Sequence, residues 1–465
     1  MSKYKYLATN TLVFFISKFS SKILVFLLLP LYTSVLSTSE YGISDLMNTS
    51  VSLFYIILTL MVAESVLRFS FDKNYEKAQI FSTGLFFILV SSILMGLGII
   101  IANKINKIKI FDGYWLHYFL LYVFYSLDNL LANFIRGLEK IKLIALAGVV
   151  GTIVTVISNI FLLVVFKYGI YGYLTSMILS HVVVSVAYLV FGRAYRYIDF
   201  KIINKNLIIE MIKYSTPIVV VQISWWINSA IDRYIVALLL GTSETGLLSL
   251  AHKIPSMLTV FTSVFMQAWK LSAIKEYESE SSRQFYSKIL NLYNSVLIIA
   301  GAFIIAFIKP ISSLIFKSEF SSAWYLAPVF ILAFVINGIS AFLGTFFIAN
   351  KNTKSLAYST LIGAGVNIIL NFVLIKRVGT FGAGISTAIS YFIISIIRIV
   401  QVEKKMHLNL EYARIITSYI LLVVLIKYVL NTNIIIIGFI LSLLLMINKK
   451  HILDFLGKAI LHFIK

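Results

Sequence analysis

Two lysines inside an apolar segment are the residues of this chain best placed to do chemistry. Lys18 and Lys22 lie within segment 10–36, whose other residues are mainly apolar. About 27 helical residues are enough to cross a hydrocarbon core of roughly 30 Å. A charge at mid-bilayer costs about 3 kcal/mol or more unless it faces an aqueous cavity or a protein partner. The segment therefore predicts a helix that lines a pathway; the alternative is that both lysines snorkel to the cytoplasmic interface.

The composition predicts an all-α polytopic membrane protein. Of 465 residues, 60% are hydrophobic and 13% are charged, against about 45–50% and 25% in soluble domains. The apolar runs are long and continuous, which favours helices over a barrel. The net charge of +21 comes mostly from loops between apolar runs. Membrane topology explains such a pattern, so no nucleic-acid partner is expected.

The chain is expected to have about fourteen transmembrane helices. Lys and Arg favour one set of loops over the other by about three to one, which predicts that both termini are cytoplasmic. No loop is long enough for an extramembrane domain. The expected spans are 10–36, 43–66, 79–102, 113–135, 143–166, 170–192, 214–240, 246–269, 289–308, 323–349, 355–375, 380–400, 413–430 and 433–448.

An internal repeat predicts the architecture. Ser39–Leu46 is similar to Ser243–Leu250, and Gly169–Gly172 is similar to Gly379–Gly382. Each repeat then holds six spans, so the two halves share one orientation. This predicts two pseudo-symmetric six-helix lobes and two further C-terminal helices. The expected divisions are an N-terminal lobe at 1–192, a cytoplasmic linker at 193–213, a C-terminal lobe at 214–405, and a two-helix appendix with an amphipathic tail at 406–465.

Ionisable residues within the expected spans of the first lobe are candidates for coupling or gating. Glu64 and Arg68 are four residues apart, which fits either an interfacial ion pair or a gate at the inner mouth. Asp128 fits a structural ion pair, including one with a lysine of the first span, or a proton-carrying site. His181 fits a hydrogen-bonded packing residue or a proton relay.

The second lobe adds further polar candidates. Asp232 and Arg233 are adjacent near the expected outer end of a span, where a structural pair between helices and a functional site are both open. Lys253 is a further candidate cation for the cavity. Three asparagines fit either a sugar-compatible cavity or contacts that hold helices together, namely Asn337, Asn367 and Asn371.

The sequence has none of the catalytic or nucleotide-binding motifs expected of a membrane enzyme or an ATP-driven pump. No cofactor or metal is therefore expected. Once these classes are excluded, the remaining function class is a secondary carrier with a cationic interior. Lys and Arg hold phosphate groups by charge-assisted hydrogen bonds, so an anionic head group suits this interior.

Several short motifs resemble the Wzx-type polysaccharide flippases of the multidrug/oligosaccharidyl-lipid/polysaccharide (MOP) exporter superfamily. The resemblance covers about residues 5–400. Asp232-Arg233-Tyr234 followed by Glu244-Thr245-Gly246 is its most specific part. The other motifs are Glu40-Tyr41-Gly42, Leu67-Arg68-Phe69, Arg136-Gly137, Tyr214-Ser215-Thr216-Pro217 and Gln267-Ala268-Trp269.

The resemblance implies a V-shaped pair of lobes around a central cavity. The substrate would be an undecaprenyl-diphosphate-linked oligosaccharide, moved from the cytoplasmic to the outer leaflet by alternating access with H⁺ or Na⁺ as coupling ion. The product would serve a surface polysaccharide such as O-antigen or capsule, with a polymerase and a chain-length regulator as further partners. The protein would lie in a bacterial plasma (inner) membrane, whose lipids would surround the lobes. Lys18, Lys22, Arg68 and Arg233 would be cavity cations, and Lys22 the first candidate for the diphosphate.

Four other functions stay open at this point. A drug or sodium antiporter of the same superfamily would need buried acids, which a cationic lining disfavours. A teichoic-acid or murein-precursor flippase is compatible with the residues, and the murein type also has fourteen spans. A membrane-embedded glycosyltransferase or polymerase is disfavoured by short outer loops. A scaffolding subunit would not need Lys22 at the midplane.

Overall fold

The computed structural model describes residues 26–463, apart from residues 73, 106–108, 278–280 and 351. This part of the chain is helical and holds no strand. Eleven of its helices are long and apolar enough to cross a membrane, or twelve if one bent pair counts as a span. The expected multi-pass helical fold is thereby confirmed, whereas the count of fourteen stays a prediction, because most of the first expected span lies outside the described residues.

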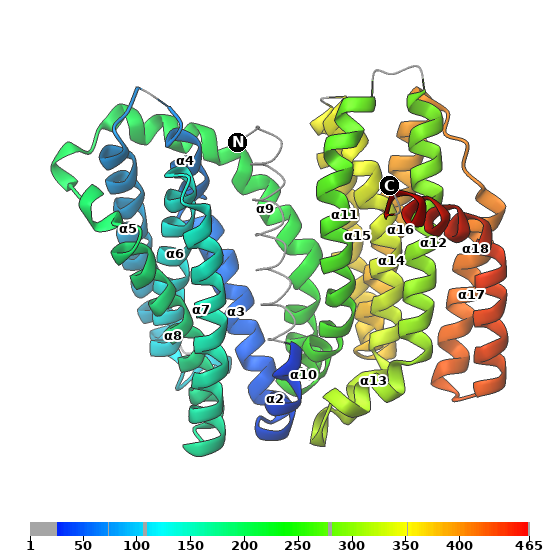
Figure 1. Cartoon of the computed structure of the whole chain (residues 1–465). Coiled ribbons are helices and arrows are strands. Elements are labelled where there is room, and N and C mark those ends of the chain that lie inside the picture. Colours follow the sequence, from blue (N-terminus) through cyan, green and yellow to red (C-terminus); the bar gives the residue numbers. More distant parts are fainter. Residues whose placement is uncertain (1–25, 73, 106–108, 278–280, 351, 464–465) are drawn as a thin grey trace. The chain divides into compact units, whose positions relative to one another are not determined.

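The chain divides into two compact units, Met1–Ala230 and Ile231–Lys465 (Figure 1). Their boundary falls inside helix α9 (Lys205–Leu240), and the assignment of 193–213 as the linker stays a prediction. The first unit contains α2 (Leu29–Val35), α3 (Thr38–Leu58), α4 (Val62–Phe69), α5 (Lys77–Ile105), η1 (Lys109–Phe111), α6 (Trp115–Gly137), α7 (Ile141–Asn159), the π-helix η2 (Ile160–Val165), α8 (Gly169–Val190), η3 (Ala194–Tyr197) and η4 (Phe200–Ile202).

The second unit continues from the end of α9. Its elements are α10 (Thr242–Ala251), α11 (Lys253–Glu276), α12 (Ser282–Ala306), α13 (Ile308–Ile315), η5 (Ser318–Tyr325), α14 (Ala327–Ala349), α15 (Thr353–Val378), α16 (Phe381–Met406), α17 (Tyr412–Leu430) and α18 (Ile434–Phe463). The last span was expected at 433–448, and the apolar part of α18 covers Ile434–His451. The same helix continues into the expected amphipathic tail and ends at Phe463.

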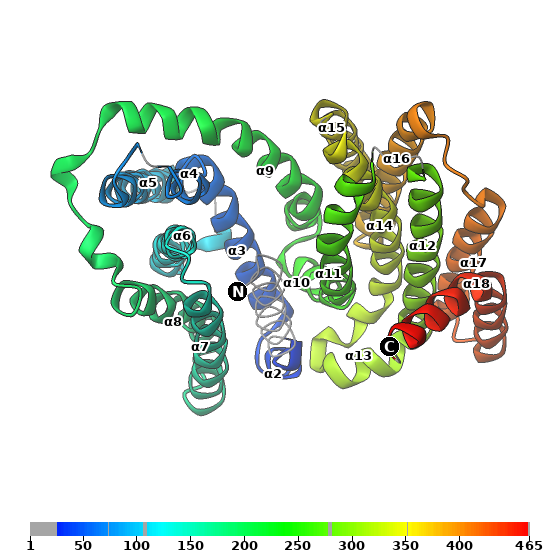
Figure 2. The same ribbon diagram turned by 45° about the horizontal axis from the view of Figure 1, so that its top comes forward.

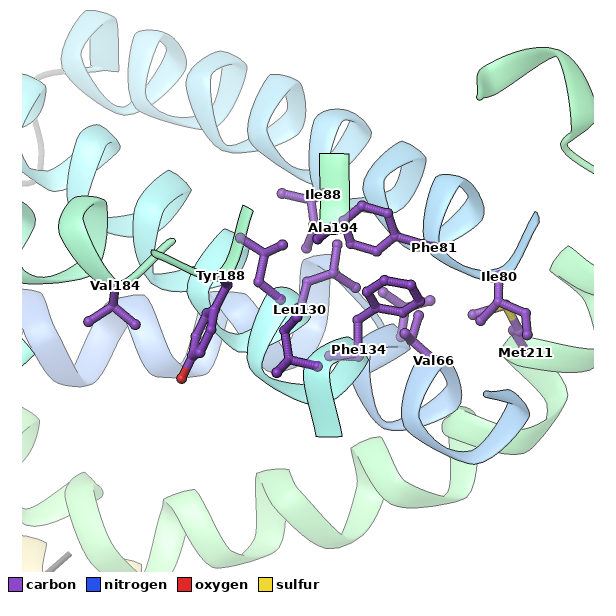
Figure 3. Packing of buried hydrophobic residues seen from close by; sticks show 14 of the residues in the cluster. Val66, Ile80, Phe81, Ile88, Leu130, Phe134, Val184, Tyr188, Ala194 and Met211 are labelled. Carbon is purple, nitrogen blue, oxygen red and sulfur yellow. The ribbon is translucent and has the colours of Figure 1, made fainter. Parts of the chain in front are cut away.

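Aromatic and branched side chains form the core of the first unit (Figure 3). Phe81 of α5 stacks on Phe134 of α6 with ring centroids 4.3 Å apart. A Cβ on Gly84 would lie 2.7 Å from a methyl carbon of Leu130, so glycine lets these two helices pack here without displacement of the leucine side chain. The first part of α9 passes beside α4 and α5 (Figure 2), where Met211 joins the same cluster.

The two copies of the sequence repeat pack in the same way inside their own units. In the first unit, the carboxylate of Glu40 lies beside Gly169 at the start of α8. In the second, Glu244 accepts a hydrogen bond from Thr380, next to the start of α16. Gly172 and Gly382 each fit against the backbone of the preceding helix, at Leu162 and Leu374. This correspondence supports the predicted pseudo-symmetric lobes.

A bend of 59° separates α3 from α4. The break lies at residues 59–61, where Leu60 and Met61 have φ values of 51° and 55°. These left-handed conformations are unfavourable for residues with a side chain, and they end the regular helix. The expected second span, 43–66, is therefore a broken helix rather than a straight one.

Polar contacts attach the C-terminal helices α17 and α18 to α12 (Figure 1). Arg414 of α17 donates hydrogen bonds to Asn291 of α12 at 2.9 Å and to Asn448 of α18 at 2.7 Å. Glu411 lies just before α17. His451 of α18 donates a hydrogen bond to its carboxylate, and Arg414 donates to the same carboxylate. These contacts hold the pKa of the Glu411 carboxyl below its ordinary value.

Candidate functional site

A titratable pair joins two helices of the first unit. Asp128 of α6 and His181 of α8 lie with Oδ2 and Nδ1 2.8 Å apart. Their side chains are 19% and 24% exposed, so the pair is partly shielded but reachable. The ring of Tyr125 meets the imidazole edge-on at 5.5 Å, and Tyr55 of α3 meets Tyr125 in the same manner at 5.4 Å. The pair can hold or exchange a proton between its two side chains.

A polar face leads from this pair to the end of α6. The amide of Asn129 donates to the carbonyl of Tyr125 at 2.8 Å, and that of Asn133 donates to the carbonyl of Asn129 at 3.1 Å. Arg136, in the last turn, donates to the side chain of Asn133 at 3.3 Å. Because these residues are three or four positions apart, they share one helix face. The polar face of this helix therefore continues to its C-terminal end.

A second titratable cluster lies in the second unit. Asp232, near the end of α9, is buried. One of its oxygens lies 3.1 Å from Nε2 of His252, at the junction of α10 and α11. The other lies 3.5 Å from the guanidinium of Arg233 and accepts the backbone N–H of Arg233 at 2.9 Å. Phe330 of α14 covers the imidazole at 4.0 Å between ring centroids. A buried carboxylate is thus neutralised by cationic or polar neighbours.

Arg398 is a buried cation near the end of the expected span 380–400, and the sequence analysis did not single it out. It lies on α16 and is 3% exposed. Its Nε donates to Ser359 Oγ at 3.0 Å, Nη1 to the carbonyl of Ser340 at 2.6 Å and Nη2 to Thr360 Oγ1 at 2.9 Å. All three acceptors are neutral, and in the described part of the chain no carboxylate pairs with it. The guanidinium therefore keeps an uncompensated positive charge inside the second unit.

The other predicted residues are not gathered into these clusters. Glu64 and Arg68 both lie on α4; Glu64 is half-buried and Arg68 is exposed, and no ion pair joins them in the described structure. Lys253 is the first residue of α11 and is half-buried. Lys18 and Lys22 lie outside the described residues. The proposed roles of all these side chains stay predictions.

Metal binding finds no support in the described ranges. Within them, no three His, Cys, Asp or Glu side chains lie close enough together to hold an ion. Both clusters instead consist of a carboxylate facing a histidine, in the second unit with an arginine added.

One family pattern and several known proteins match the sequence. The sequence pattern of the family described as "Polysaccharide biosynthesis protein" matches residues 7–270. The "Probable low-salt glycan biosynthesis flippase Agl15" of Haloferax volcanii is 24% identical over 213 residues, which make up 44% of each chain. The alignment thus spans less than half the length of that relative. An uncharacterized membrane protein of Methanocaldococcus jannaschii is 23% identical over 58% of this chain and 67% of its own.

Solved structures show the same fold. An inward-facing multidrug resistance MATE family transporter of the MOP superfamily superposes with a TM-score of 0.70, at 14% identity, over 83% of this chain and 94% of its own. The lipid II flippase MurJ, in an inward closed conformation, superposes with a TM-score of 0.66, at 16% identity, over 95% and 98%. Because the family pattern matches more than half of the sequence, the chain belongs to the family described as "Polysaccharide biosynthesis protein".

Proposed function

We propose that this chain is a flippase for a lipid-linked oligosaccharide. The substrate is carried on undecaprenyl diphosphate and moves from the cytoplasmic to the outer leaflet of the plasma membrane by alternating access. Both chain termini are cytoplasmic in this proposal. The translocated unit then serves the synthesis of a surface polysaccharide such as O-antigen or capsule. Family membership and the likeness to a named glycan flippase support the substrate class.

The balance of buried charge is the observation that carries the proposal. Of the described Asp, Glu, Lys and Arg residues, two are buried, namely Asp232 and Arg398. Asp232 faces Arg233 and His252, whereas Arg398 faces neutral acceptors. Because Arg233 compensates the charge of Asp232 and no acid compensates that of Arg398 among the described residues, the interior of the second unit is positive rather than negative. A positive interior suits an anionic diphosphate and disfavours a cationic drug or sodium as cargo.

The remaining cations extend this picture as parts of the proposal. Lys18, Lys22, Arg68, Arg233 and Lys253 would supply charge to the pathway, with Lys22 the first candidate to hold the diphosphate. Lysine and arginine pair with phosphate oxygens by charge-assisted hydrogen bonds, which are about twice as strong as neutral ones.

Coupling to an ion is assigned in this proposal to the acidic clusters. Asp128 and His181 form one partly exposed pair, and Asp232 forms the other with its basic neighbours. Glu64 contributes to gating at the bend between α3 and α4. A proton is the coupling ion that a carboxylate–imidazole pair accommodates best, because both side chains accept and release protons.

A flippase for a murein precursor is the second candidate. The observation in its favour is that the superposition on the lipid II flippase includes 95% of this chain, against 83% for the multidrug transporter. The two candidates differ in the glycan that accumulates when the protein is missing.

Depletion in cells tests the proposal. Membranes from cells lacking the chain are exposed to glycan-degrading enzymes from the outside, and the lipid-linked glycans that stay protected are extracted and analysed. Finished oligosaccharide units trapped inside support the proposal, and protected murein precursor supports the second candidate. Units exposed outside but not polymerised would indicate a polymerase, and the absence of any lipid-linked intermediate would overturn both flippase assignments.

A further inference from the structure

A small cavity lies among α11, α12 and α14 within the second unit. Its volume is about 80 Å³. None of the side chains that line it carries a charge. Leu258 and Leu297 form apolar parts of its wall, while Thr259, Thr262 and Asn337 contribute polar groups. An uncharged lining that mixes apolar and hydrogen-bonding groups excludes an ion or phosphate as its natural occupant.

The hydroxyl of Tyr293 is buried at this cavity without a hydrogen bond. Tyr293 lines the cavity and is 5% exposed. Its hydroxyl finds no partner within the described part of the chain. A Cβ on Gly338, another lining residue, would lie 3.6 Å from this oxygen, so the hydroxyl is directed to the cavity side of the ring. A buried polar group without a partner costs about 1–3 kcal/mol, which a bound ligand or water would offset.

The hydrogen bonds already present show which donors and acceptors the cavity can still provide to a ligand. The hydroxyls of Thr259 and Thr262 donate to main-chain carbonyls of their own helix, so their oxygens are left as acceptors. The carbonyl oxygen of Asn337 accepts from Ser340, so its amide N–H groups are left as donors. With the O–H of Tyr293, the cavity presents donors and acceptors together. A group that both donates and accepts is its complement.

We infer that this cavity binds the hydroxyl-bearing edge of a neutral sugar, as a subsite for the glycan of the proposed flippase substrate. An apolar cavity of about 150 Å³ holds a benzene ring, so roughly half that volume admits a substituent such as a hydroxymethyl group while the sugar ring stays outside. The substituent's hydroxyl accepts from Tyr293 and donates to a threonine oxygen, and its carbon packs against the leucines. The inference rests on the proposed function for the origin of the sugar.

The test uses the full chain in lipid nanodiscs and two probes that differ in one group. Methyl β-D-glucopyranoside carries a hydroxymethyl group, and methyl β-D-xylopyranoside has the same ring without it. Saturation-transfer NMR titrations give the dissociation constant of each. We expect the glucoside to bind three- to tenfold more tightly, as one or two neutral hydrogen bonds provide.

Tyr293→Phe removes only the unpaired hydroxyl and is expected to reduce the preference for the glucoside to about one. Its thermal stability should equal or exceed that of the wild type, because no protein hydrogen bond is lost. Tyr286→Phe is the matched control on the same helix: the hydroxyl of Tyr286 donates to the carbonyl of Ala273 at 2.8 Å. That variant should lose stability and keep the sugar preference.

Equal binding of the two probes, or an unchanged preference in Tyr293→Phe, would overturn the inference and leave the cavity to water. Displacement of the glucoside by equimolar glycerol would overturn it in favour of a lipid head group. The depletion experiment reads out the proposed function separately. Normal flipping with no sugar preference contradicts the subsite alone, whereas a sugar preference without any trapped glycan contradicts the flippase assignment.

Discussion

Replacement of Arg398 by methionine tests whether this buried cation serves the stability of the fold or the transport of an anionic substrate. Methionine fills a similar length of space with apolar atoms and removes the charge. The two side-chain acceptors do not lose all their hydrogen bonds in this variant. Ser359 and Thr360 each also donate to the carbonyl of Leu356, at 2.9 and 2.8 Å. They therefore stay paired when the guanidinium is gone.

The expected change in stability follows from two opposing terms. Hydrogen bonds to a charged group contribute about 1.5–3 kcal/mol each, and the desolvation of a buried ion costs several kcal/mol. Three hydrogen bonds and one buried charge at Arg398 therefore nearly cancel. We expect the free energy of unfolding of Arg398→Met to lie within about 1–2 kcal/mol of the wild-type value. Arg398→Ala also leaves a cavity and should lose about 3–5 kcal/mol.

The expected change in transport is larger. At an effective dielectric constant of about 20, a unit charge contributes about 1.7 kcal/mol to an anion roughly 10 Å away. A diphosphate with two charges would lose about 3 kcal/mol of attraction, which corresponds to about 100-fold in affinity. Arg398→Lys keeps the charge and loses the planar fork, so it should retain more transport than Arg398→Met.

The assay pairs thermal unfolding of each purified variant with the rescue of trapped lipid-linked glycan in depleted cells. Rescue by Arg398→Met at the wild-type level would refute the electrostatic reasoning. Unfolding of Arg398→Met as easily as Arg398→Ala would refute the stability reasoning and make the arginine a structural contact among α14, α15 and α16.

Three further predictions concern other parts of the chain. A double-mutant cycle of Asp128→Asn and His181→Gln should give a coupling of about 1–2 kcal/mol in unfolding, between the values for exposed and buried pairs; additive effects would contradict the observed contact. Gly382→Ala should destabilise the protein by about 2 kcal/mol or more, because its Cβ would lie 2.5 Å from the backbone of the preceding helix, whereas Gly365→Ala has open space and should be neutral or stabilising; equal melting temperatures would be inconsistent with this packing. The lowered pKa of Glu411 means that its contacts stabilise the start of α17 above the ordinary carboxyl pKa and are lost as the pH falls through the lowered value. Hydrogen-exchange protection factors there, corrected for the pH dependence of intrinsic exchange, should fall in acid in the wild type and should not fall in Glu411→Gln.

The fold was predictable from the sequence because its signals are local and repeated. Long apolar runs define helices, and the paired Ser-Glu-x-Gly motifs define two related lobes. The bend after α3 was not predictable, since Leu60 and Met61 have no preference for the left-handed conformation that they adopt. The last apolar run and the amphipathic tail after it were expected as two segments and form one helix, because hydropathy marks the apolar part of a helix and not its end.

The site was predictable only in part. Rare ionisable residues in apolar runs marked Asp128 and His181 one by one, but only the fold brings two residues 53 positions apart into contact. Arg398 was overlooked because basic residues near the cytoplasmic end of a span normally reach the interface. The sequence feature that indicates its burial is the Ser359-Thr360 pair, which accepts its hydrogen bonds. This pair can be recognised only when the packing of α15 against α16 is known.

The flippase assignment is tested most directly by the orientation of lipid-linked glycan in depleted membranes. The account predicts that finished undecaprenyl-diphosphate-linked units accumulate in the cytoplasmic leaflet, protected from enzymes added outside, and that the wild-type chain returns them to the outer leaflet. Full exposure of these units to the outside enzymes in cells that lack the chain would contradict it.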